Sequence, residues 1–135
     1  MRSDNLLLNS EGILKLADFS NAIKPPSDSS PTSKEIVGVP YWQAPEIRRG
    51  PYNVFKVDIW SLGATIWECA EAKPPFSENE KFAERWPPLT RPKIYPPAFH
   101  EFLKMCSEPM DKRPGVEGVM KVGFCRFAVP RADDL

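Results

Sequence analysis

The sequence predicts a mostly helical α+β domain, with a short β-hairpin at its N-terminal end followed by helices. The hairpin is indicated by two short apolar runs, residues 5–8 and 13–17, on either side of a polar turn that contains glycine. The helices are indicated by two longer stretches, 57–72 and 97–107, in which apolar side chains recur every three or four positions. A chain of 135 residues has room for one domain with one core.

The elements follow one another with clear boundaries. Residues 9–12 supply the turn of the hairpin, and its second strand ends at Asp18. Residues 21–39 show little periodicity and are rich in Ser, Pro and Lys, which predicts a mobile surface loop. A short helical turn is expected at residues 44–46, because proline suits the first position of a helix.

The helix predicted over residues 57–72 is apolar on most sides, which places it in the middle of a core. One face carries Ile59, Leu62, Ile66 and Cys69, and much of the rest is covered by Trp60, Gly63, Ala64 and Trp67. The prolines at 74 and 75 end it. The helix over 97–107 places four apolar residues on one face, and a weaker helix follows Pro114.

Composition excludes several classes of function. Lys plus Arg equals Asp plus Glu, at 18 each, so nothing in the charge favours nucleic acid or an anionic membrane. The three cysteines are widely spaced without a CxxC pair, which indicates neither a zinc site nor a disulfide framework. No signal pattern opens the chain, and its most apolar stretch is too short and too often interrupted to span a bilayer. We therefore expect a soluble intracellular protein, in the cytoplasm, that binds neither nucleic acid nor membrane.

Five short motifs occur in a fixed order along nearly the whole chain. They are Ser3-Asp4-Asn5-Leu6-Leu7-Leu8, Ala17-Asp18-Phe19, Tyr41-Trp42-Gln43-Ala44-Pro45-Glu46, Val57-Asp58-Ile59-Trp60-Ser61-Leu62-Gly63 and Lys112-Arg113-Pro114. Each alone is a weak signal, but all five in order are highly specific. The set resembles the C-terminal lobe of the eukaryotic protein kinase domain, most closely that of the Sterile-twenty-like or p21-activated-like serine/threonine kinases. The resemblance implies a partial kinase domain over residues 1–124, with an activation segment at 18–46 and a C-terminal tail at 125–135.

The resemblance also implies ATP and Mg²⁺ as cofactors and a protein substrate or regulator as partner. Phosphoryl transfer needs hard oxygen ligands that hold Mg²⁺ against the nucleotide phosphates. By resemblance these ligands are the Asn5 amide and the Asp18 carboxylate, which a hairpin can bring to one edge. Leu7 resembles the residue that forms the floor of the adenine pocket, so Leu7 and Asp18 are the expected nucleotide contacts. The sequence does not indicate an oligomeric state.

Three further residues match structural positions of the family. Glu46 corresponds to a carboxylate that pairs with a distant arginine, for which Arg113 is the candidate. Asp58 corresponds to a residue that hydrogen-bonds the backbone of the catalytic loop. At the start of the predicted helix it would also favour the helix dipole.

Four residues depart from the family pattern. Arg2 stands where the catalytic loop has lysine, and a forked guanidinium is not equivalent to an ammonium group. Ser20 follows Phe19 where the family has the glycine of Asp-Phe-Gly, which reduces backbone freedom. Val39 replaces a threonine whose hydroxyl it cannot supply. Glu35 falls where the activating phosphothreonine usually lies, so its carboxylate is expected to mimic part of that charge.

The family would place a His-Arg-Asp motif and an upper lobe before Met1, so we expect the catalytic base to be absent from this chain. Three interpretations stay open. The chain is a serine/threonine kinase represented by an N-terminally truncated C-lobe that is inactive alone, a pseudokinase-type binding or scaffold module, or a truncated gene product or mis-predicted start. Whether the chain is itself an enzyme is therefore left open. The family also has a helix before the catalytic loop, and its absence would expose Trp60, Ile66 or Trp67.

Overall fold

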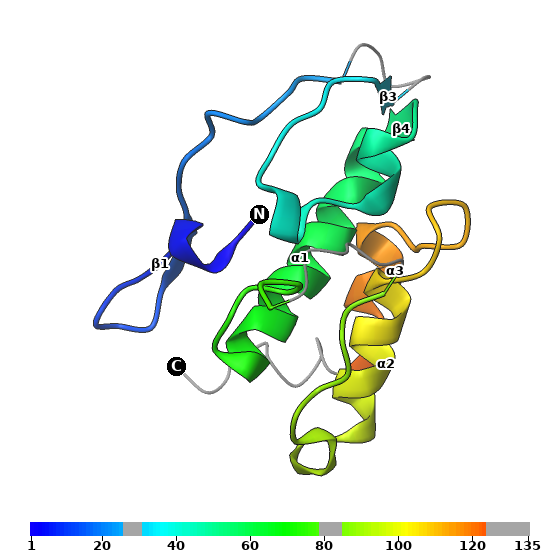
Figure 1. Ribbon diagram of the computed structural model, residues 1–135. Coiled ribbons are helices and arrows are strands. Elements are labelled where there is room, and N and C mark those ends of the chain that lie inside the picture. Colours follow the sequence, from blue (N-terminus) through cyan, green and yellow to red (C-terminus); the bar gives the residue numbers. More distant parts are fainter. Residues whose placement is uncertain (26–30, 79–84, 124–135) are drawn as a thin grey trace.

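A long central helix, α1 (Val54–Glu71), organises the computed structural model, which describes residues 1–25, 31–78 and 85–123. In Figure 1 the N-terminal hairpin lies to one side of α1 and α2 (Pro97–Cys106) to the other. The remaining elements are β1 (Leu6–Leu8), β2 (Leu14–Leu16), β3 (Thr32–Ser33), β4 (Tyr52–Asn53), α3 (Val116–Met120) and four short 3-10 helices, η1 (Ser3–Asn5), η2 (Pro40–Trp42), η3 (Pro45–Arg48) and η4 (Pro92–Ile94). The predicted α+β fold class, mostly helical behind an N-terminal hairpin, is confirmed.

The hairpin pairs β1 with β2 in antiparallel register, with Leu7 opposite Lys15. Its turn is closed by the side chain of Asn9, whose Oδ1 accepts hydrogen bonds from the backbone N–H groups of Glu11 (3.0 Å) and Ile13 (2.8 Å). Gly12 has φ of 80°, a left-handed conformation that costs glycine little. Most apolar side chains of the hairpin are exposed, so local pairing and turn chemistry hold it together rather than a core of its own.

Helix α1 begins three residues before the predicted start at 57, because Asn53 caps it. The Asn53 side chain accepts hydrogen bonds from the backbone N–H groups of Phe55 (3.0 Å) and Lys56 (3.2 Å). The prediction that Asp58 lies at the helix start is therefore wrong: Asp58 is in the second turn, beyond the reach of the first-turn dipole effect. The helix ends at Ala72, which has left-handed backbone geometry, just before the two prolines.

The core forms along two parts of α1. One side of α1 packs on η3 and β4, and Ile59 and Trp67 pack on α2 and the segment around α3. The first cluster comprises Ala44, Ile47, Tyr52, Val54, Val57 and Trp60. The second comprises Ile59, Trp67, Phe99, Phe102, Leu103, Cys106, Val119 and Val122. This double packing agrees with the expectation that the helix lies in the middle of the core.

The predicted exposure of Trp60 or Trp67 is wrong. Both indoles are buried, Trp60 against Trp86 at 4.8 Å between ring centroids and Trp67 within the cluster shared with α2. The other face of α1 is the more open one, since Ile66 is half-buried and Cys69 is exposed. The large exposed apolar side chains of the N-terminal region lie on the hairpin and just after it: Leu7, Leu8, Ile13, Leu14, Leu16 and Phe19.

The segment expected to be a mobile loop is partly tied to the core. Thr32 and Ser33 form β3 and pair with Asn53 and Tyr52 of β4. The Tyr52 hydroxyl donates to the backbone oxygen of Glu35 at 2.6 Å. The composition of residues 21–39 did not predict this pairing, because the pairing depends on β4, a strand of two residues about twenty positions further along the chain. The predicted tail, residues 125–135, lies outside the described residues.

No helix within the described ranges combines the length and the apolar character needed to cross a membrane.

Candidate functional site

A cavity of about 390 Å³ lies between the hairpin, the segment after it, residues 37–43 and the first half of α1. Six of the residues singled out from the sequence line it: Arg2, Asn5, Asp18, Phe19, Val39 and Asp58. They come from four separate parts of the chain. The fold therefore gathers most of the expected site residues in one place.

Asn5 and Asp18 line the same cavity because each lies where a hairpin strand joins its neighbouring segment. The backbone N–H of Ala17 donates to the carbonyl oxygen of Asn5 at 2.8 Å, which extends the ladder one pair beyond the strands. Asp18 follows directly, with φ of 57°. This left-handed conformation is uncommon outside glycine but is tolerated by Asp better than by most residues. Both side chains therefore come from the same end of the hairpin.

Ser20, one of the residues that depart from the family pattern, holds the carboxylate of Asp18 by hydrogen bonds. Its Oδ1 accepts one hydrogen bond from the Ser20 hydroxyl at 2.6 Å and another from the Ser20 backbone N–H at 3.1 Å. The hydroxyl bond is the main reason that the pKa of Asp18 is lowered, with the backbone bond next and a smaller effect from Arg2. Within the described residues, Oδ2 has no hydrogen-bond donor. Asp18 therefore offers an ionised carboxylate with one open oxygen.

Replacing Ser20 with alanine is expected to raise the pKa of Asp18, because the hydroxyl bond is lost while the backbone bond stays. The lowered pKa stabilises the fold above the ordinary aspartate value, and this contribution is lost as the pH falls through the lowered value. The Ser20→Ala variant should lose less stability on acidification than the wild type. A carbon-detected NMR titration of the Asp18 carboxyl measures the change, and superimposable titrations would contradict it.

Arg2 does not reach Asp18 directly. Its Nε forms an ion pair with Asp4 Oδ1 at 2.9 Å, and its guanidinium lies 5.9 Å from the centre of the Trp42 ring. The influence of Arg2 on Asp18 is thus through space, as one of the causes that lower the pKa of Asp18. The ion pair with Asp4 uses the Nε edge of the Arg2 guanidinium and holds the Arg2 side chain at the wall of the cavity.

Asp58 faces the same cavity from α1. Partial burial raises the pKa of its carboxyl, and the positively charged amino group of Met1 acts in the opposite direction. The structure thus places Asp58 beside the segment that it was expected to anchor. No hydrogen bond from that segment to Asp58 is present within the described residues.

Two of the expected site residues lie elsewhere. Leu7 is 56% exposed on the hairpin and is not part of the cavity wall. Glu35 is exposed as well, and within the described residues its carboxylate has no partner, although its backbone is held by Tyr52. Neither residue therefore contacts the Asn5 and Asp18 site in this structure.

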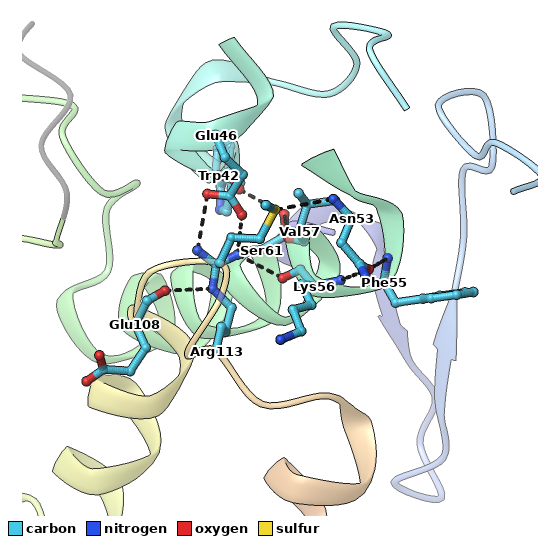
Figure 2. Close-up of polar contacts among 10 residues, drawn as sticks. Trp42, Glu46, Asn53, Phe55, Lys56, Val57, Ser61, Glu108 and Arg113 are labelled. Atoms are coloured by element: carbon cyan, nitrogen blue, oxygen red, sulfur yellow. Dashed lines mark hydrogen bonds and ion pairs between the residues drawn. The ribbon is translucent and has the colours of Figure 1, made fainter. Parts of the chain in front are cut away.

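Glu46 and Arg113 form a bidentate ion pair beside α1 (Figure 2), and neither residue lines the cavity. The two N···O distances are 2.5 Å to Oε1 and 3.2 Å to Oε2, and the Arg113 side chain is 1% exposed. The remaining donors of Arg113 reach the backbone oxygens of Lys56 (2.9 Å) and Glu108 (3.0 Å). Its guanidinium also lies 5.2 Å from the centre of the Trp60 ring. One side chain thus joins η3, α1 and the segment after α2.

Comparison with known proteins identifies the family to which this chain belongs. The protein kinase domain family matches residues 1–125. The chain belongs to this family. It is 35% identical to serine/threonine-protein kinase pakC of Dictyostelium discoideum over 95% of this chain and 28% of that protein. It is 34% identical to serine/threonine-protein kinase shk1/pak1 of Schizosaccharomyces pombe over 96% of this chain and 21% of that protein.

A third relative, serine/threonine-protein kinase 10 of Xenopus tropicalis, is 37% identical over 84% of this chain and 13% of that protein. The resemblance to p21-activated-type and Sterile-twenty-type kinases is therefore confirmed. The chain spans between 13% and 28% of the length of these three relatives.

Protein kinases in general use ATP with Mg²⁺, and the oxygen donors of Asn5 and Asp18 fit that ion. Mg²⁺ in such sites takes one or two protein oxygens and completes its shell with water and phosphate oxygens. Asn5 and Asp18 are one amide and one ionised carboxylate at the end of the hairpin. Within the described ranges, no cluster of three or more His, Cys, Asp or Glu side chains is arranged to hold a metal by itself.

Sequence reasoning missed Glu68, which does not line the cavity but bonds two segments that border it. Its carboxylate accepts hydrogen bonds from Ser3 and from Trp42, which lie 65 and 26 residues away along the chain. The signal was present as an acidic residue in an otherwise apolar stretch of the core helix. A carboxylate in a partly buried part of a helix needs hydrogen-bond donors from other segments of the chain, but the sequence does not show which residues supply them.

Proposed function

We propose that residues 1–124 contribute the C-terminal-lobe part of a serine/threonine protein kinase site, with residues 125–135 as a tail and a cytoplasmic location. The reaction of such a kinase moves the γ-phosphoryl group of ATP to a Ser or Thr hydroxyl of a protein. The observation that carries the proposal is the placement of Asn5 and Asp18 at one end of the hairpin, facing one cavity.

In this proposal Asn5 and Asp18 hold the Mg²⁺ ion that accompanies the nucleotide. Bound Mg²⁺ would supply positive charge against the phosphate oxygens. The hydrogen bond from the Ser20 hydroxyl favours the ionised form of Asp18 and fixes its Oδ1. Because the carboxylate is rigid, the same bond sets the orientation of Oδ2. Arg2 adds positive charge at the cavity wall, where a phosphate group would be favoured.

We expect residues 1–135 by themselves to transfer no phosphate. The printed sequence contains a single histidine, His100, which lies on α2 with its Nε2 2.9 Å from the backbone oxygen of Pro92. No His-Arg-Asp motif is therefore encoded within these residues to accept the substrate proton. Incubation of this polypeptide with Mg²⁺, γ-labelled ATP and a generic protein substrate should yield no labelled protein.

A second candidate is a pseudokinase-type binding or scaffold module. The exposed apolar side chains of the hairpin favour it, because contiguous apolar surface often marks a protein contact. Arg2, Ser20 and Val39 favour it too, since each departs from the family pattern beside the catalytic site. A partner protein, as substrate or regulator, is expected in both cases.

The metal role is tested by replacing Asp18 with asparagine. With Mn²⁺ and ATP as a paramagnetic probe, the wild type should show selective broadening of the NMR signals of Asn5 and Asp18. Loss of a carboxylate ligand should weaken this binding at least about tenfold. Asp111→Asn is the matched control, since it removes the same charge from an exposed position outside the cavity.

The two candidates give different results in this titration. Selective broadening at Asn5 and Asp18 that is lost in Asp18→Asn supports the kinase site. Binding of Mn²⁺ and ATP elsewhere, or equal weakening in the Asp111→Asn control, would reject the assignment and favour a module that acts by protein contact alone.

A further inference from the structure

The carboxylate of Glu68, near the end of α1, collects donors from two separate segments. Its Oε1 accepts from the Ser3 hydroxyl at 2.7 Å, and its Oε2 accepts from the Ser3 backbone N–H at 3.3 Å. The same Oε2 accepts from the indole N–H of Trp42 at 2.9 Å. Two carboxylate oxygens thus serve three donors.

The first segment is the one that carries Asn5. Ser3 and Asn5 belong to the same 3-10 turn, η1, directly before β1. Among the described residues, the hydrogen bonds that join residues 1–20 to α1 both end on Glu68. Since the hairpin has little buried apolar surface, this carboxylate is its main polar connection to the core helix.

The second segment is the one that ends the proposed activation segment. Trp42 is buried and fixed to α1 twice, through its indole to Glu68 and through its carbonyl oxygen, which accepts from the Ser61 hydroxyl at 2.8 Å. Trp42 lies beneath the guanidinium of Arg2, so its position also shapes the wall of the cavity. A shift of either segment would therefore alter the hydrogen bonds of the same carboxylate, that of Glu68.

We propose that Glu68 is a positioning residue, which holds the Asn5 turn and the Trp42 segment in one fixed relation on α1. Its importance for phosphoryl transfer rests on the proposed function, whereas the coupling of the two segments does not. A carboxylate accepts from all three donors, whereas glutamine offers one acceptor oxygen and an NH₂ group that can only donate, either to the Ser3 hydroxyl or against the indole N–H of Trp42. Glu68→Gln therefore removes the negative charge that strengthens these hydrogen bonds, and at least one of the three donors loses its carboxylate acceptor.

The experiment is amide and indole hydrogen exchange by NMR on the whole chain, comparing Glu68→Gln with Glu71→Gln. Glu71 lies one turn further along α1 and also accepts two hydrogen bonds, both from Thr90. We expect Glu68→Gln to speed exchange roughly tenfold both at the Trp42 indole and at the Asn5 and Ala17 amides. Glu71→Gln should change exchange at Thr90 and leave these three protons as they are.

A result confined to one segment would overturn the coupling. If Glu68→Gln speeds exchange at the Trp42 indole alone, or at neither segment while the chain stays folded by circular dichroism, Glu68 does not position both. Ser3→Ala is a second variant outside the core, and it covers the case in which Glu68→Gln fails to fold. It should shift the Trp42 indole resonance through the shared carboxylate, and an unmoved resonance would equally reject the proposal.

These measurements need neither metal nor nucleotide, so they separate the two proposals. If Mn²⁺ and ATP do not bind at Asn5 and Asp18, the proposed function fails while the exchange results still decide the role of Glu68. If they do bind, Glu68→Gln should weaken the broadening at Asn5 severalfold. It should leave the pKa of Asp18 unchanged, because Ser20 controls that group.

Discussion

Replacing Arg113 with methionine is expected to lower the free energy of unfolding by about 3–5 kcal/mol. The change leaves the Glu46 carboxylate, whose side chain is 15% exposed, without its cation. It also removes the donors of the Lys56 and Glu108 carbonyl oxygens. Because whole domains are stable by only about 5–15 kcal/mol, this one side chain decides a large part of the total.

Urea unfolding followed by fluorescence measures this effect. Lys112→Met is the matched control, since it removes a positive charge from the neighbouring exposed position and should change stability by less than about 0.5 kcal/mol. The double variant Arg113→Met with Glu46→Leu should be more stable than Arg113→Met alone, because no charge is then left stranded. Equal losses in the single and double variants would show that the stranded charge is not the cause.

Replacing Gly63 with alanine is expected to destabilise the chain by about 1–3 kcal/mol. Gly63 lies inside α1, where alanine would otherwise gain about 1 kcal/mol of helix propensity. A Cβ atom at this position would lie 2.5 Å from the Cβ of Cys106 and 2.4 Å from the Cη2 of Trp86. The indole can turn aside, but Cys106 Cβ is fixed to the backbone of α2, so the two helices must separate.

The same unfolding experiment tests this prediction, with Cys69→Ala as control. Cys69 is an exposed position of the same helix, so its replacement should alter stability by no more than about 0.5 kcal/mol. A Gly63→Ala variant as stable as the wild type would mean that α1 and α2 can shift apart without loss.

Much of the fold follows from local patterns in the sequence. The alternation around a glycine-containing turn predicted the hairpin. The spacing of Phe99, Phe102, Leu103 and Cys106 predicted a helix over 97–107, one residue longer than α2. The start of α1 was misplaced because the capping of Asn53 is a side-chain contact that periodicity does not register. The pairing of β3 with β4 was missed because two-residue strands carry no period of their own.

The candidate site, too, was predicted in part and missed in part. Asn5, Asp18, Glu46 and Arg113 were singled out by motifs matched to a known family, and the structure brings them into two pairs. Ser20 looked from the sequence like a lost glycine, whereas the structure gives its hydroxyl a bond to Asp18. Leu7 lies outside the lining of the cavity, and its contact with adenine stays a prediction.

Local patterns in the sequence were enough to predict the family, the order of the hairpin and the main helices, and the residues that carry charge at the site. Those properties are written in short motifs and in the period of apolar residues, which act over a few positions of the chain. Only the tertiary structure decided that Glu68 joins Ser3 to Trp42, that Trp60 and Trp67 are buried, and that α1 and α2 touch at Gly63. Each of these is a contact between distant segments, and a distant contact exists only once the core has packed.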